Sequence, residues 1–219
     1  ADFEKTMEGI GRACFANTGQ VCLGTERIYV QRGIFDRIAE GLAHKARAYQ
    51  FGDPFDNATT MGPVISQEHR SKVLSYYDKA KTEGAEVLVG GGVPDLQGYE
   101  GGYWVEPTVF ADVKPGMRIA REEIFGPVLS IMKWSSEDEM IAMANDVELG
   151  LTAAVWTNDI TSAMTTARAL ENGYVWINGV GAHVRGMPYG GYKNSGTGRE
   201  RGLEEMVSYT EEKSIHIML

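Results

Sequence analysis

The sequence predicts an α/β domain with an open, largely parallel sheet and helices on both of its faces. Apolar residues at helical spacing alternate along the chain with short apolar runs that are typical of strands. No repeat, low-complexity tract or linker interrupts this alternation over the 219 residues. Because strands that alternate with helices form βαβ units, whose strands pair in parallel, we expect one such domain over residues 1–207.

In the first half of the chain, capping residues mark where helices begin. Asp2 is placed to cap the first helix, whose apolar face includes Phe3 and Cys14, and Ser66 is placed to cap a later one that Gly84 ends. The expected elements are a helix over residues 3–14, a strand over 25–31, helices over 34–49 and 66–84, and strands over 85–89 and 104–113.

The second half repeats this pattern and ends differently. Ser136 and Glu139 have the spacing of a capping box, and Asp159 is placed to cap a helix that Gly173 ends. The expected elements are strands over residues 127–134, 151–157 and 174–178, with helices over 136–147 and 159–170 between them. Residues 208–219 alternate loosely, which predicts a terminal strand that adds to the home sheet or pairs with an edge of another chain.

Charge and composition argue against several classes of protein. The chain has 30 acidic and 21 basic residues, a formal net charge of −9, which disfavours wrapping around nucleic acid. Charged residues interrupt every apolar stretch, so no membrane span is expected, and the first residues lack the pattern of a signal peptide. Two cysteines suit a reducing compartment, and we expect a cytoplasmic protein. The absence of an initiator Met suggests a piece of a longer chain.

The first candidate for chemistry is Cys22. It lies in a polar, glycine-punctuated segment, residues 15–24, between the first helix and the first strand. A free thiol has a pKa of about 8.5, so a modest downward shift makes it a thiolate at neutral pH. The alternative is a buried, inert cysteine. Cys14 fits that alternative because it shares the apolar face of the first helix, whereas Cys22 does not.

Three other features are weaker candidates. Glu122 and Glu123 precede an apolar strand, where paired acids usually lie in a solvated turn and less often bind ligand hydroxyls. The glycine-rich loop over residues 179–202 contains Gly196-Thr197-Gly198, but no strand immediately precedes that run, so the match to a dinucleotide-binding fingerprint is weak. The histidines have no metal-ligand spacing, so no metal is expected. We expect His44 and His69 on the surface, and only His183, in the glycine-rich loop, near a pocket.

Three segments together resemble the signatures of the NAD(P)-dependent aldehyde dehydrogenase superfamily. They are residues 15–22 (FANTGQVC), 122–127 (EEIFGP) and 187–200 (MPYGGYKNSGTGRE), in the family's order and spacing. The resemblance implies a catalytic domain over residues 1–207 and an oligomerisation strand over 208–219, with most of the N-terminal cofactor domain absent from this chain. It also implies an aldehyde substrate, NAD or NADP as the cofactor, and a homo-oligomer, either a dimer or a tetramer.

The resemblance assigns roles to particular residues. Cys22 is expected to attack the aldehyde carbon and form a thiohemiacetal, which loses hydride to give a thioester that water hydrolyses to the acid. The backbone N–H of Cys22 is one expected oxyanion donor. Glu123 is expected to accept hydrogen bonds from the nicotinamide ribose, and Phe125 to pack near that ring. Glu200 is similar to a glutamate near the family's proton-exit route.

The same resemblance places the aldehyde entrance at Tyr189 and the loop over residues 179–187. Gly181 leaves room there, and His183 and Tyr189 suit a polar or aromatic aldehyde. The family's general-base glutamate and its asparagine oxyanion donor have no counterpart in this chain. A CoA-acylating dehydrogenase, or a binding or structural protein that keeps the fold, therefore remain alternatives, although Cys22 argues against the second. We expect this chain alone to fold without turning over.

Overall fold

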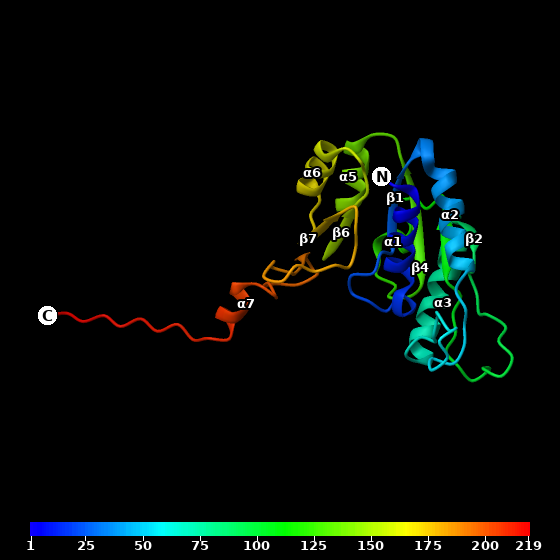
Figure 1. Cartoon of the computed structure of the whole chain (residues 1–219), viewed down its shortest axis with the longest axis horizontal. Helices are drawn as coiled ribbons and strands as arrows, with labels where there is room; N and C mark the ends of the chain where they lie inside the picture. The colour runs from blue at the N-terminus through cyan, green and yellow to red at the C-terminus, as the bar shows by residue number, and fades with distance from the viewer.

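A computed structural model describes residues 1–219, and its main sheet has four strands in the order β1-β4-β3-β2 (Figure 1). These strands are β1 (Arg27–Gln31), β2 (Glu86–Val89), β3 (Thr108–Ala111) and β4 (Val128–Trp134). β4 is parallel to both β1 and β3, with Arg27 opposite Ser130 and Thr108 opposite Val128. β2 is antiparallel to β3, so the sheet is mixed.

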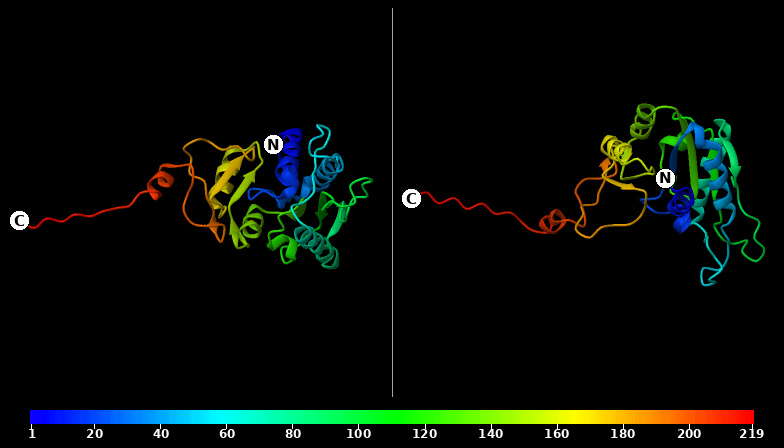
Figure 2. Two further views of the ribbon diagram at one scale, coloured as in Figure 1. Left: turned by 90° about the horizontal axis from the view of Figure 1, so that it is seen from below. Right: turned by 45° about the horizontal axis from the view of Figure 1, so that its top comes forward.

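Helices cover both faces of this sheet (Figure 2). They are α1 (Phe3–Phe15) and α2 (Phe35–Arg47) on one face, and α3 (Gln67–Thr82) and the short α4 (Arg118–Arg121) on the other. Successive residues of β4 reach opposite cores: Leu129 and Ile131 pack with α1 and α2, whereas Val128 and Met132 pack with α3. Because a central parallel strand is buried on both faces, β4 is apolar from Val128 to Met132 except for the buried Ser130. No helix is both long enough and apolar enough to span a bilayer.

A smaller α/β unit packs against the first helix. Its elements are α5 (Glu137–Asn145), β5 (Leu149–Gly150), β6 (Thr152–Val155), α6 (Ile160–Ala169), β7 (Tyr174–Ile177) and β8 (Tyr192–Lys193). β6 and β7 pair in parallel, and β5 and β8 pair antiparallel. A Cβ placed on Gly9 of α1 would lie 2.5 Å from the indole of Trp156, so α1 contacts the end of β6 directly. The α/β fold class is confirmed, with its strands divided among three sheets.

The predicted helix caps are confirmed by hydrogen bonds. Asp2 accepts from the backbone N–H of Lys5 at 2.9 Å, and Ser66 accepts from that of His69 at 3.1 Å. Asp159 accepts from two backbone N–H groups in the first turn of α6. Gly84 follows α3 with a φ of +94°, the left-handed conformation that glycine adopts without steric cost. These local signals explain why the helix starts were predictable.

Several predicted boundaries are wrong. β3 begins at Thr108 and not at residue 104, because Pro107 has no N–H to donate to a strand ladder. The Ser136 cap of α5 is confirmed, because its hydroxyl accepts from the backbone N–H of Glu139 at 3.3 Å, whereas the Glu139 carboxylate accepts from Ser135 N, one residue before the cap. α6 ends at Ala169, ahead of Gly173. A Cβ on Gly173 would lie 1.8 Å from the carbonyl oxygen of Gly190, so this glycine allows close backbone packing and does not end the helix.

The C-terminal region differs from the expected strand at its start. Ser208 is the last residue of α7 (Leu203–Ser208). Residues 211–219 form neither helix nor strand and extend away from the body of the molecule (Figure 1). The segment therefore does not add to the home sheet, because its N–H and C=O groups face no strand of this chain. Pairing with an edge of another chain remains a prediction.

Candidate active site

A tight turn presents Cys22 at the surface. After α1 the chain enters a 3₁₀ turn, Ala16–Gly19, in which Asn17 and Thr18 adopt positive φ values of 49° and 56°. The Thr18 hydroxyl donates to the carbonyl of Gly62 at 3.0 Å and fixes this turn. The next turn is closed by a hydrogen bond from Gly24 N to the carbonyl oxygen of Val21, 2.8 Å long. Cys22 is inside that turn and exposed, as predicted.

Cys14 has the opposite environment. It is only 2% exposed and belongs to the core between α1, α2 and the sheet. Its thiol donates to the carbonyl of Val128 at 3.5 Å, and burial raises the pKa of Cys14 well above its ordinary value. The expectation of a buried cysteine is confirmed at this position, and Cys22 remains the candidate for reactivity.

The adjacent acids Glu122 and Glu123 have different surroundings. Glu122 accepts two hydrogen bonds of 2.7 Å from the Arg118 guanidinium and one of 2.5 Å from the Tyr76 hydroxyl. These bonds lower the pKa of Glu122 from 4.5 to about 2. The side chain of Glu123 is exposed and makes no hydrogen bond or ion pair within the chain. Glu122 is therefore held by partners within the chain although part of its side chain is exposed, whereas the Glu123 carboxylate is solvated, as expected for such a turn, and has no partner in this chain.

Phe125 is half-buried and held in a left-handed conformation, with a φ of 61°. The backbone N–H groups of Ile124 and Phe125 donate to the two carboxylate oxygens of Glu26, at 3.0 and 2.7 Å. The carbonyl of Phe125 accepts from Nε2 of His69 at 2.7 Å. The expectation of a surface position for His69 is wrong, because its ring packs beside that of Phe125.

Glu26 and His69 are the residues that sequence reasoning missed. Glu26 was seen only as part of the strand over residues 25–31, although an acid at the start of a buried strand needs partners. Burial raises the pKa of Glu26, while the two backbone N–H groups and Arg27 act in the opposite direction. Both oxygens of this carboxylate therefore bind the backbone of Ile124 and Phe125, about 100 residues away in sequence.

An aromatic cluster formed by β7 and the glycine-rich loop lies beside the nucleophile turn. The His183 ring is 4.9 Å from that of Tyr189 and also contacts Tyr174 and Trp176. The Tyr189 hydroxyl and Nδ1 of His183 are buried without a hydrogen-bond partner of standard geometry. Burial, with the neighbouring Cys22, raises the pKa of Tyr189 to about 12. The cluster therefore places a protonated phenol beside the thiol.

Glu200 and Gly181 occupy the margins of this cluster. The backbone of Glu200 exchanges two hydrogen bonds with that of Tyr189, at 2.9 and 2.7 Å, and its side chain is exposed. Gly181 is exposed with a φ of +77°, and an added Cβ would meet no atom within 4 Å. Gly181 is therefore open to solvent, and its place at an aldehyde entrance remains a prediction.

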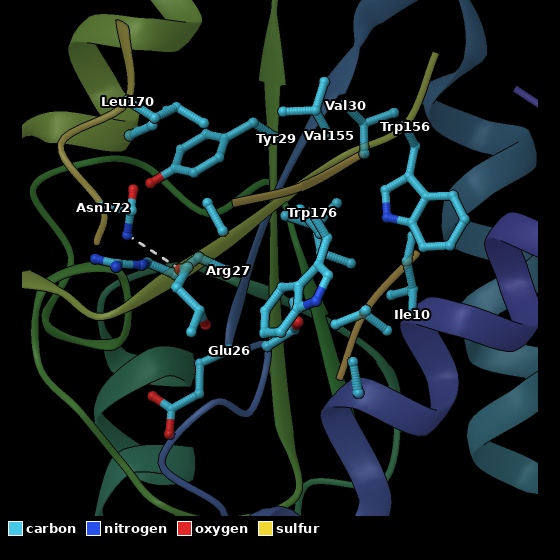
Figure 3. Close-up of a pocket in the computed structure, with 18 of the residues that line it drawn as sticks. Ile10, Glu26, Arg27, Tyr29, Val30, Val155, Trp156, Leu170, Asn172 and Trp176 are labelled. Carbon is cyan, nitrogen blue, oxygen red and sulfur yellow. Dashed lines mark hydrogen bonds between the residues drawn. The ribbon is translucent and has the colours of Figure 1, made fainter. Parts of the chain in front are cut away.

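A cleft of about 900 Å³ lies between the main sheet and the smaller unit. Cys22, Glu26 and Glu123 line it together with residues of β1 and β6. Figure 3 shows its walls, with Trp156 and Trp176 on one side and Tyr29 and Asn172 on the other. The structure thus brings Cys22 and Glu123 to one cleft. Five other predicted residues do not line it, namely Phe125, Gly181, His183, Tyr189 and Glu200.

Comparisons with known proteins agree on one family. A family model described as the aldehyde dehydrogenase family matches residues 1–215. Betaine aldehyde dehydrogenases from Brucella ovis and Brucella abortus are 47% identical over 217 residues, 99% of this chain and 45% of theirs. Betaine aldehyde dehydrogenase from Staphylococcus aureus, solved in complex with NAD⁺, is 42% identical with a TM-score of 0.92, over 95% of this chain and 42% of that one. The chain spans about half the length of these relatives.

Proposed function

This chain belongs to the aldehyde dehydrogenase family, and from that premise we propose that its protein oxidises an aldehyde to a carboxylic acid with NAD or NADP as the hydride acceptor. The observation that carries the proposal is the exposed Cys22 thiol in the cleft that Glu123 also lines. The solved relative that contains NAD⁺ supports a nicotinamide cofactor.

The residues of this chain fit the nicotinamide end of such a cofactor. Glu123 has a free carboxylate, and an ionised carboxylate accepts hydrogen bonds from ribose hydroxyls. Phe125 adds an aromatic ring two residues away, held by its backbone. We propose that Glu123 binds the ribose and that Phe125 packs near the ring. When bound, the cofactor supplies the hydride acceptor.

Cys22 supplies the nucleophile. Its thiolate attacks the carbonyl carbon to form a thiohemiacetal, and the thioester left after oxidation is hydrolysed by water. The backbone N–H of Cys22 is one donor to the developing oxyanion, a kind of contact typically worth about 3–4 kcal/mol of barrier. Glu26 is not available as a general base, because both its oxygens accept from backbone N–H groups. The rival release of the acyl group to coenzyme A uses the same Cys22 chemistry.

We propose that the substrate is a polar or aromatic aldehyde that enters past Gly181, His183 and Tyr189. The rings of His183, Tyr174 and Trp176 offer a surface for an aromatic group, and aromatic faces also attract quaternary ammonium groups such as that of betaine aldehyde. The phenol of Tyr189 offers an unused donor beside the thiol. Glu200 is proposed for the proton route.

Steady-state kinetics of the complete protein test this proposal. The panel contains betaine aldehyde, an aromatic aldehyde, an ω-carboxy aldehyde and acetaldehyde, each with NAD and with NADP. We expect NADH formation and a preference for the larger aldehydes, and a preference for acetaldehyde would contradict the proposed entrance. Dependence of product release on added coenzyme A would favour the acylating alternative. We propose that the 219-residue chain alone produces no NADH, because it lacks the family's base and phosphate contacts.

A further inference from the structure

Side chains from two other elements hold both backbone polar groups of Phe125. Its N–H donates to Oε1 of Glu26 at 2.7 Å, and its carbonyl accepts from Nε2 of His69 at 2.7 Å. The preceding N–H, of Ile124, donates to Oε2 of Glu26 at 3.0 Å. Phe125 has a φ of 61°, a conformation that a bulky residue adopts only when its surroundings impose it.

The main chain of Glu26 is itself fixed to the central sheet. Its carbonyl accepts from Ser130 N at 2.8 Å, and the next residue, Arg27, lies opposite Ser130 in the β1–β4 ladder. Glu26 is also four residues beyond Cys22 and two beyond the turn that presents the thiol. Its main chain therefore contacts the central sheet, and its side chain contacts the turn that carries Glu123 and Phe125.

An ionised carboxylate suits this position. It accepts two N–H donors at once, one on each oxygen, whereas a carboxamide of the same size accepts with its oxygen and places an NH₂ group against the second donor. The two hydrogen bonds from Ile124 and Phe125 therefore depend on the charge of Glu26 and on the length of its side chain.

We propose that Glu26 is a positioning residue that holds the Ile124–Phe125 turn so that Glu123 and Phe125 face the nicotinamide riboside beside Cys22. The ligand class rests on the proposed function, whereas the hydrogen bonds between Glu26 and the backbone of Ile124 and Phe125 do not. Without the hydrogen bonds from Ile124 and Phe125 to Glu26, Phe125 can leave its left-handed conformation. This change weakens cofactor binding, whereas the turn that presents Cys22 keeps its position.

The test compares Glu26→Gln with wild type in the complete protein. Site-resolved amide hydrogen exchange without cofactor reports on Ile124 and Phe125, and fluorescence titration reports NAD affinity. Because hydrogen bonds to charged groups are the strong ones, we expect at least about tenfold faster exchange at these two amides and about tenfold weaker NAD binding. Alkylation of Cys22 by iodoacetamide should stay within about twofold of wild type. Glu83→Gln is the matched control, because Glu83 also accepts a backbone N–H, that of Arg118 at 2.9 Å, and it should change neither readout.

Each outcome decides the proposal. The proposal is overturned if, in Glu26→Gln, the exchange rates of both amides and the NAD affinity stay within twofold of wild type. It is also overturned if exchange is faster to the same degree over the whole chain. If the Gln variant does not fold, Glu26→Asp replaces it, since it keeps the charge and withdraws the oxygens by one methylene; wild-type exchange and affinity in that variant also overturn the proposal. A wild-type protein that binds no NAD refutes the proposed function, and amide exchange then still decides whether Glu26 holds the turn.

Discussion

Gly19 and Gly126 are in direct backbone contact: a Cβ placed on Gly19 would lie 2.0 Å from the carbonyl oxygen of Gly126. Gly19 also has a φ of +73°. The turn that presents Cys22 and the segment that carries Glu123 therefore touch main chain to main chain, with no side chain between them. This contact fixes the backbone of the turn before Cys22 against the backbone of the segment that follows Glu123.

Replacing Gly19 by Ala should therefore be costly. The added methyl group meets the Gly126 carbonyl and the residue keeps an unfavourable φ, so we expect a loss of at least about 1–3 kcal/mol in the free energy of unfolding. Gly33→Ala is the control, because an added Cβ at that position meets nothing within 4 Å, and it should stay within about 0.5 kcal/mol. Urea denaturation measures both, and equal effects would refute the close contact.

The two cysteines should differ both in their reactivity and in the effect of replacing them. In the complete protein we expect Cys22→Ser to abolish NADH formation while the fold and NAD binding persist, since the hydroxyl is a far weaker nucleophile. Cys14→Ser should keep most activity with a modest loss of stability, because it puts a hydroxyl into an apolar core. Peptide mapping after limiting iodoacetamide should find Cys22 labelled before Cys14. Faster labelling of Cys14, or an inactive Cys14 variant, would reverse the assignment.

Glu123 and Glu122 should also differ. Glu123→Gln weakens hydrogen bonds to the ribose that depend on charge, so we expect about tenfold slower single-turnover NADH formation. Glu122→Gln removes an acceptor of the Arg118 guanidinium and should lower stability with little change in hydride transfer. Stopped-flow absorbance in the complete protein makes this comparison, and unchanged single-turnover rates in Glu123→Gln would count against its role.

The pH dependence of the free energy of unfolding should show the contribution of the Glu122 charge. Its hydrogen bonds to Arg118 and Tyr76 lower its pKa from 4.5 to about 2, so the folded state favours the charged form. The stabilisation is fully present above about pH 4.5 and is lost as the pH falls towards 2. Urea denaturation of wild type and Glu122→Gln between pH 2 and 7 should show a difference that shrinks over this range. A difference independent of pH would mean that the charge is not responsible.

Local signals made most of the fold predictable. Helix starts depend on a cap within three residues, such as Asp2 or Ser66, and buried strands depend on apolar runs, so short windows of sequence contain the information. The expected start of β3 is wrong because Pro107 lacks the N–H that a strand ladder requires, and the expected strand at Ser208 is wrong because this residue ends α7. The division into three sheets depends on which strands meet in space, and periodicity does not determine that.

Residues of the candidate site were predictable only where the local sequence pattern indicated their surroundings. Cys22 was separable from Cys14 because it lies off the apolar face of the first helix. Glu26 and His69 were missed because their partner, Phe125, is 99 and 56 residues away in sequence. A buried carboxylate acquires its role from the groups it meets after folding, so only the structure identifies it.

The C-terminal segment should mediate assembly. Residues 211–219 pair with nothing in this chain, and the side chains of Ile215, Ile217 and Leu219 are exposed. An extended segment with unpaired N–H and C=O groups and apolar side chains gains most by adding to the edge of another sheet. β1 and β6 each pair with a strand on one side only, which leaves such edges in this chain. We expect an oligomer whose mass, measured by light scattering, falls when residues 209–219 are removed. Substitution of Ile217 by Lys should have the same effect, whereas Lys213→Ala, which removes no apolar side chain, should not. An unchanged mass after the truncation would show that this segment does not hold the subunits together.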